Sequence, residues 1–228
     1  MKFPGKLDPP SRVGVPSRWH AEVIWMAQYG SWVFILALFI YDFLIQGPSR
    51  YSFRRAVIVD NWTRLADALL DFLAYLAWQI LPIIFVASDW IDVWNYRLPA
   101  PAVLVGGVLL AASLFVLWRA YRDLGANWSP KLDVRQEQQL VTTGIYARIR
   151  HPIYAGMFLW AIAQPLLIWN WLAGPAFGLV FLPLYVTRMP REEQMMLEHF
   201  GDEYRQYMLT SGRLLPRRPG NVEPGSVS

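Results

Sequence analysis

The sequence predicts an all-α integral membrane protein with about five transmembrane helices. Hydrophobic residues make up 55% of the 228 positions, and 12 of them are Trp. A soluble domain of this length rarely carries so high an apolar fraction. Several apolar stretches also reach the roughly 20 residues that one helix needs to cross the hydrocarbon core.

The predicted elements follow one another with short polar connections. Apolar spans are expected at 23–45, 65–86, 101–118, 153–169 and 172–187, and a polar helix at about 190–209. This divides the chain into four regions. They are an irregular N-terminal segment at 1–18, a three-span region at 19–118, a catalytic region at 119–216 and a flexible tail at 217–228.

The last two predicted spans are short. At about 1.5 Å per residue, helices over 153–169 and 172–187 barely cross a core about 30 Å thick. A helical hairpin with its turn at Asn170 fits these lengths better than two independent spans. The polar helix that follows is then expected to cap the hairpin on the cytoplasmic side.

Loop charges predict the orientation in the membrane. The connections 46–64 and 119–150 are rich in Arg and Lys, and such loops lie on the cytoplasmic side. The connection 87–99 and the Asn170 turn are then outside. Five spans would also place the N-terminus outside, although Lys2 and Lys6 favour the opposite.

Composition also argues against several classes of site. The chain has no Cys, which excludes disulfides and thiolate metal ligands. The three His residues are scattered, so we expect no metal. The net charge of +4 is spread over the loops and indicates topology, so we expect no nucleic-acid partner.

Two polar blocks beside apolar helices could carry chemistry. In the first, 138–154, Gly144 permits a tight turn and Pro152 suits the first turn of a helix. Free N–H groups at that helix N-terminus suit an anion. An alternative is that Arg150 and Tyr154 only anchor the helix at the membrane interface.

The second block is RMPREE at 188–193. Arg188 and Glu192 are four residues apart and share a helical face if the helix continues. A solvated ion pair is the simple interpretation. Pro190 between them disturbs a helix, which favours a bound cationic group or a cofactor hydroxyl instead.

Two features inside the spans are interpreted as structural. Asp67 and Asp71 lie at helical spacing where unpaired acids are costly, and Arg64 is the expected partner. Gly106-Gly107 interrupts an apolar helix and is expected to allow close packing against a neighbour.

Residues 119–216 resemble the isoprenylcysteine carboxyl methyltransferase family, which is related to phospholipid N-methyltransferases. The resemblance rests on DLGANWS at 123–129, LVTTGIYARIRHPIY at 140–154, RMPREE at 188–193, FGDEYRQY at 200–207 and GRLLP at 212–216. Order and spacing both match, and the chain looks most similar to prokaryotic members with five spans.

The resemblance implies a membrane methyltransferase that uses S-adenosyl-L-methionine. It implies Arg188 as the catalytic, substrate-binding residue. The cofactor-binding residues that it implies are Gln138, Gln139, Leu140, Val141, Tyr146, His151, Pro152, Ile153, Tyr154 and Glu192. Eukaryotic members have a histidine where this chain has Gln138.

The implied acceptor is the carboxylate of an isoprenylcysteine-like lipophilic molecule that enters from the bilayer. A phospholipid amine, or a small lipophilic amine or thiol, is an alternative acceptor, with His151 as the nearest base for an amine. A sterol-type reductase and a non-catalytic membrane protein are alternatives of another class. The active site is expected to face the cytoplasm, from the inner membrane of a prokaryote or the endoplasmic reticulum of a eukaryote.

Overall fold

Three long apolar units dominate the computed structural model, which describes residues 18–49, 58–129, 132–135 and 138–217. The first is α1 (Arg18–Phe39) with the π-helical turn η1 (Ile40–Gln46). The second is α3 (Leu65–Tyr75), the π-helical turn η2 (Leu76–Ile80) and α4 (Leu81–Ala87). The third is α5 (Pro101–Leu124). By length and composition, each unit can cross a membrane, over Trp25–Ser49, Leu65–Ala87 and Pro101–Asn127.

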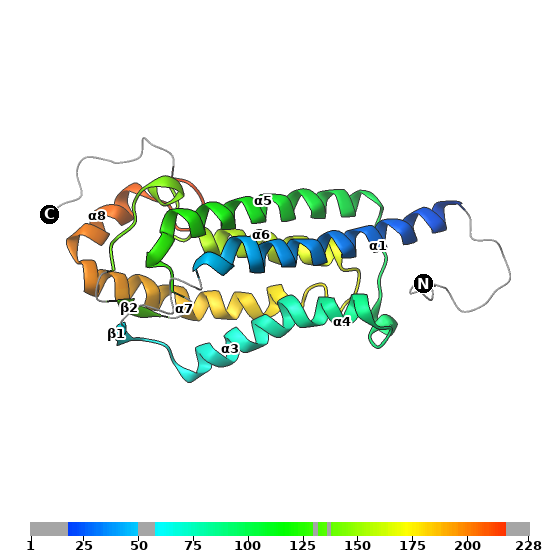
Figure 1. Cartoon of the computed structure of the whole chain (residues 1–228), viewed down its shortest axis with the longest axis horizontal. Coiled ribbons are helices and arrows are strands. Elements are labelled where there is room, and N and C mark those ends of the chain that lie inside the picture. Colours follow the sequence, from blue (N-terminus) through cyan, green and yellow to red (C-terminus); the bar gives the residue numbers. More distant parts are fainter. Residues whose placement is uncertain (1–17, 50–57, 130–131, 136–137, 218–228) are drawn as a thin grey trace.

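The C-terminal half contributes three further helices, α6 (Pro152–Leu167), α7 (Ala176–Phe200) and α8 (Asp202–Thr210). The long helices run along the long axis of the molecule, and α8 lies at one end (Figure 1). α6 is apolar but shorter than a full span. The chain is therefore an integral membrane protein with three long apolar helices among the described residues, and five spans stay a prediction.

One expectation about these elements was wrong. The predicted span 172–187 and the predicted polar helix 190–209 are not separate, because α7 runs unbroken through Pro190 and ends at Gly201, which has a φ of 54°. Side-chain donors bond to carbonyls of the turn before Pro190: Thr187 Oγ1 to Pro183 at 2.9 Å and Arg191 Nε to Thr187 at 3.0 Å. Proline at 190 leaves the carbonyl of Val186 without its helical N–H donor. The two side-chain contacts instead add donors to the nearby carbonyls of Pro183 and Thr187.

The predicted all-helical class is confirmed, and a short pair of strands accompanies the helices. Two short strands, β1 (Ile58–Asn61) and β2 (Asp133–Arg135), pair antiparallel near the α8 end of the molecule (Figure 1). They join the connections that follow the first and third long units. Several parts of the chain lie outside the described residues. They are the irregular segment before Arg18, the tail beyond Arg217, and the loop residues Arg50, Arg54 and Arg55.

Asn170 forms the predicted hairpin turn between α6 and α7. Its Oδ1 accepts from the backbone N–H groups of Leu172 at 3.0 Å and Ala173 at 2.9 Å. Its Nδ2 donates to the carbonyl of Ile91 and to Asn95 Oδ1, both at 2.8 Å. The turn is thereby fixed to the connection after α4, so these two connections lie at the same end of the molecule, as the sequence predicted.

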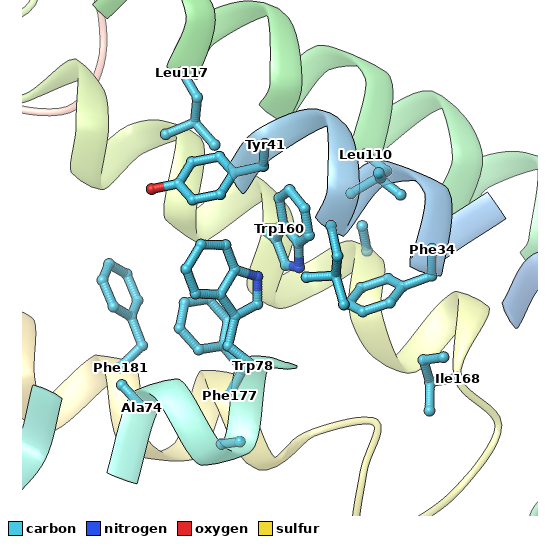
Figure 2. Close-up of a cluster of buried hydrophobic side chains, with 14 of the residues drawn as sticks. Phe34, Tyr41, Ala74, Trp78, Leu110, Leu117, Trp160, Ile168, Phe177 and Phe181 are labelled. Atoms are coloured by element: carbon cyan, nitrogen blue, oxygen red, sulfur yellow. The ribbon is translucent and has the colours of Figure 1, made fainter. Parts of the chain in front are cut away.

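The core between the helices is built from aromatic side chains. Trp160 of α6 is fully buried and lies edge-on to Phe34, Tyr41 and Trp78, at centroid distances of 5.5, 5.9 and 5.3 Å. Figure 2 shows this cluster, with Phe177 close to Trp78. Each such pair is worth about 0.5–1.5 kcal/mol beyond area burial. The cluster therefore joins α1, η2, α6 and α7.

Glycines let α5 and α6 approach closely, as predicted for one of the Gly106-Gly107 pair. A Cβ on Gly106 would lie 2.9 Å from Leu166 Cβ, whereas a Cβ on Gly107 would meet nothing within 4 Å. On the facing helix, a Cβ on Gly156 would lie 2.7 Å from Leu117 Cγ. Ser113 Oγ donates to the carbonyl of Gly156 at 2.8 Å, which also requires close helices.

This asymmetry predicts opposite outcomes for two neighbouring substitutions. Gly106→Ala should destabilise the fold by overpacking, which typically costs about 1–3 kcal/mol. Gly107→Ala should leave stability unchanged or raise it, because Ala gains up to about 1 kcal/mol of helix propensity over Gly. Thermal unfolding in detergent measures both, and equal effects at the two positions would contradict the close packing.

Candidate active site

One cavity of about 450 Å³ lies among α3, α6, α7 and the segment that precedes α6. Every residue that the sequence predicted for the site lines it: Gln138, Gln139, Leu140, Val141, Tyr146, His151, Pro152, Ile153, Tyr154, Arg188 and Glu192. The structure thus brings the two polar blocks together around one space. The roles of these residues stay predictions.

The segment 138–147 is fixed to the end of α5. Asn127 Oδ1 accepts from the backbone N–H of Gln139 at 2.9 Å. Gly144 has a φ of 63°, as its predicted turn requires. Asp123 Oδ2 accepts from the Ile145 N–H at 2.8 Å, and it would lie 2.2 Å from a Cβ on Gly144. This geometry directs Tyr146, which is buried, into the cavity wall.

The C-terminal segment after α8 binds the residues that lead into α6. The backbone N–H groups of Arg150 and His151 donate to the carbonyls of Gly212 at 2.8 Å and Arg213 at 3.0 Å. Gly212 N–H donates in return to Arg148 at 2.9 Å. Residues 211–213 therefore fix the backbone of His151 in place.

Glu193 is the centre of a buried charge cluster behind the cavity. Its side chain is 7% exposed and contacts Arg150 Nε at 3.3 Å, His151 Nε2 at 3.3 Å and Arg213 Nη2 at 2.6 Å. Burial opposes ionisation, yet the bonds from His151 and Arg213 lower the pKa of Glu193 to about 2. The carboxylate is therefore charged at neutral pH.

Glu192 faces the cavity, next to this cluster. Its Oε2 accepts from Tyr154 Oη at 2.8 Å, and its Oε1 lies 3.6 Å from His151 Nδ1. Burial would raise the pKa of Glu192, but His151, Arg188 and Tyr154 together lower it. For His151, burial would lower the pKa, but Glu192 and Glu193 raise it above 6.5. The two carboxylates thus favour the protonated form of the imidazole.

Two ion pairs join α3 to α7. Arg188 Nη1 donates to Asp71 Oδ1 at 3.2 Å and to Oδ2 at 3.3 Å. One turn away, Arg191 Nη2 donates to Asp67. The expected pairing of these acids with the Arg64 side chain was wrong, because Arg64 gives Asp67 only its backbone N–H, at 2.8 Å. The packing of α3 against α7 instead brings into reach arginines that lie 117 and 124 residues further along the chain.

The cavity changes from polar to apolar along its length. Glu192 and His151 form its polar wall, whereas Trp78, Phe177 and Phe181 contribute an apolar wall. The Phe177 ring stacks on Trp78 at 5.8 Å and on Phe181 at 5.2 Å (Figure 2). The Asp71–Arg188 pair also lines this cavity. Such a space can hold a polar ligand beside a lipophilic one.

Sequence reasoning did not place three features at this site. Glu193 was not among the predicted site residues, although it contacts Arg150, His151 and Arg213. Asp71 was interpreted as structural, although it lines the cavity. Asp67 and Asp71 lie one helical turn apart, as do Arg188 and Arg191. This shared spacing could have predicted that the two acids pair with the two arginines. Nothing in the sequence indicated that Arg213 reaches Glu193.

The charged state of His151 predicts a pH-dependent stability. Because its pKa is raised in the fold, the stabilisation is fully present below about pH 6.5 and is lost as pH rises through the folded-state pKa. The melting temperature of His151→Gln should therefore fall furthest below that of the natural protein at about pH 6, and the gap should narrow toward about pH 9. A gap independent of pH would mean that His151 is not charged.

Comparisons with known proteins agree with this geometry. The model of the isoprenylcysteine carboxyl methyltransferase family matches residues 104–198. Protein-S-isoprenylcysteine O-methyltransferase A of Arabidopsis thaliana is 25% identical over 174 residues, which are 76% of this chain and 83% of that protein. The Schizosaccharomyces pombe enzyme is 40% identical over 72 residues, which cover 32% of this chain and 30% of that enzyme.

The human protein-S-isoprenylcysteine O-methyltransferase is 30% identical over 105 residues, 46% of this chain and 35% of its own length. The chain thus spans most of the plant relative and about a third of the other two. The narrower resemblance to prokaryotic members stays a prediction. Over residues 104–198, which contain α6 and most of α7, the chain is therefore similar to the isoprenylcysteine carboxyl methyltransferase family.

Proposed function

We propose that the chain is an S-adenosylmethionine-dependent membrane methyltransferase that acts on the carboxylate of an isoprenylcysteine-like lipophilic acceptor. One observation carries the proposal. A single cavity joins a polar wall at Glu192 to an apolar aromatic wall at Trp78, and Arg188 lines the same space. The reaction needs this combination, because one reactant is polar and charged and the other is dissolved in lipid.

The donor set of the cavity fits S-adenosylmethionine. Glu192 can accept from an ammonium or from ribose hydroxyls, and the amides of Gln138 and Gln139 can both donate and accept. Leu140, Val141 and Tyr146 offer apolar surface for a flat base. The volume of about 450 Å³ lies within the usual range for small-molecule sites. When bound, S-adenosylmethionine would supply the methyl group of its sulfonium. An acceptor nucleophile would take that methyl carbon in line, with the neutral thioether as leaving group.

The residues of the chain then mainly position and shield the reactants. Arg188 binds and orients the acceptor carboxylate, and Glu192 fixes the cofactor. An acceptor carboxylate is already ionised near pH 7, so no general base is required. Placing two reactants in line can supply much of the rate. The apolar side chains around Trp78 exclude water, which favours the approach of opposite charges.

The state of His151 favours a carboxylate over an amine acceptor. An amine nucleophile must lose a proton, and His151 is the nearest candidate base. Glu192 and Glu193 raise the pKa of His151, which favours the protonated imidazole, and that form has no lone pair to accept another proton.

We further propose that the site faces the cytoplasm. The cavity lies at the end of the molecule where the connections 46–64 and 119–150 meet the long helices, and these connections carry the excess of basic residues. Residues 119–216 form the catalytic region in this proposal. The acceptor enters it from the bilayer, alongside membrane lipid.

Arg188 and Glu192 should have separable roles. Arg188→Gln should lower kcat/KM for N-acetyl-S-farnesylcysteine by about 100-fold, because the acceptor loses its orientation. It should change the Kd for S-adenosylmethionine by less than about threefold. Methyl transfer from labelled cofactor in detergent and calorimetric cofactor binding measure the two effects. Arg191→Gln is the matched control, since Arg191 also pairs with α3 but does not line the cavity.

Glu192→Gln should show the converse pattern. Loss of the charge-assisted bond should weaken S-adenosylmethionine binding by about tenfold or more. At saturating cofactor, kcat should recover most of its value. Unchanged cofactor affinity in this variant, or equal loss of cofactor binding in Arg188→Gln, would contradict the assignment of roles.

A further inference from the structure

One exposed side of α5 is apolar along its length and ends in an arginine. Val108, Phe115 and Trp118 lie at helical spacing on this side, and all three are exposed. Arg122 follows one turn later, in the last turn of α5, and is exposed as well. All four residues belong to the candidate span Pro101–Asn127. This side of the helix therefore changes from apolar to cationic where the span ends.

The Trp118 ring holds the Arg122 guanidinium next to the apolar residues. Arg122 Cζ lies 5.3 Å from the centroid of the Trp118 ring, which is within the range of a cation–π contact. Side chains on a helix point toward its N-terminus, so this contact directs the charge back along the span. An arginine that interacted only with water would extend past the end of the helix instead. The charge is therefore held at the level of a Trp side chain, where lipid headgroups lie.

The acid next to Arg122 in the sequence is engaged by other groups. Asp123 Oδ2 pairs with Arg119 Nη2 at 3.1 Å and accepts from the Ile145 N–H at 2.8 Å. Arg119 Cζ also lies 5.9 Å from the Trp118 ring centroid. Two guanidiniums thus meet one indole ring, and one carboxylate balances them. No acid among the described residues pairs with Arg122, so this group of side chains keeps a positive charge.

We propose that the Arg122 end of α5 binds an anionic phospholipid of the membrane. The lipid phosphate complements the two guanidiniums, whose forked donors suit phosphate oxygens. The acyl chains continue along Phe115 and Val108, so the lipid and the helix present charge and hydrocarbon in the same order. A zwitterionic lipid carries its own cation beside the phosphate and gains less from the excess positive charge. This site is separate from the cavity, because neither Arg122 nor Trp118 lines it.

Lipid titration of the purified full-length protein in a neutral detergent tests this site. Dioleoyl phosphatidylglycerol should raise the melting temperature at about tenfold lower concentration than dioleoyl phosphatidylcholine. Arg122→Gln should remove most of this difference. Trp118→Leu keeps the surface apolar but removes the ring that holds Arg122, and should reduce the difference about threefold. Arg205→Gln is the control and should keep the full difference, since Arg205 is an exposed arginine that pairs with Asp202 on α8.

Glycerol phosphate supplies the same headgroup without acyl chains. It should not compete with phosphatidylglycerol at equal concentration, because it cannot contact Phe115 or Val108. Effective competition would mean that the site takes a soluble anion, which would overturn the inference. Equal effects of the two lipids on the natural protein would also overturn it and would mean that Arg122 and Trp118 only anchor α5 at the interface. An undiminished difference in both Arg122→Gln and Trp118→Leu would show that the anionic lipid binds elsewhere.

Discussion

The carboxylate of Glu193 is the interaction on which the rest of the site depends. It is almost fully buried, and it binds cations from two other parts of the chain: Arg150 and His151 before α6, and Arg213 after α8. A buried ion left without its partners typically costs about 3–5 kcal/mol. The three segments must therefore meet for any of them to be stable, and their meeting is what turns His151 toward Glu192 in the cavity.

Helices of the N-terminal region complete a cavity whose polar wall comes from the region that matches the family model. Residues 104–198 supply His151, Glu192 and Arg188, whereas α3 and η2 supply Asp71 and Trp78. The matched region therefore supplies only part of the cavity wall, and helices that lie before residue 104 supply another part.

Local patterns predicted the long apolar units, the Asn170 turn and the lining of the cavity, since hydrophobic runs, turn residues and motif spacing act over short distances. What the sequence did not reveal depends on tertiary contact. α7 continues through Pro190, although a proline inside a helix locally favours a break. The pairing of Asp67 with Arg191 crosses 124 positions of sequence, and Arg64, the nearest cation, was a reasonable but wrong local choice. The small sheet likewise joins β1 and β2 across a long separation.

The two π-helical turns show how membrane helices can form an irregular wall around a ligand space. π-helical turns are rare and often occur at functional sites. η1 carries Tyr41 and η2 carries Trp78, and these rings line the cavity in edge-on contact at 4.6 Å. Backbone groups displaced in apolar surroundings need other partners. Gln164 Nε2 donates to the carbonyl of Ala77 within η2 at 3.0 Å, and Gln79 Nε2 of η2 donates to Asp42 of η1 at 2.9 Å. Polar side chains inside the apolar bundle thus support the turns that present aromatic rings to the acceptor, and this explains why they lie so deep among hydrophobic neighbours.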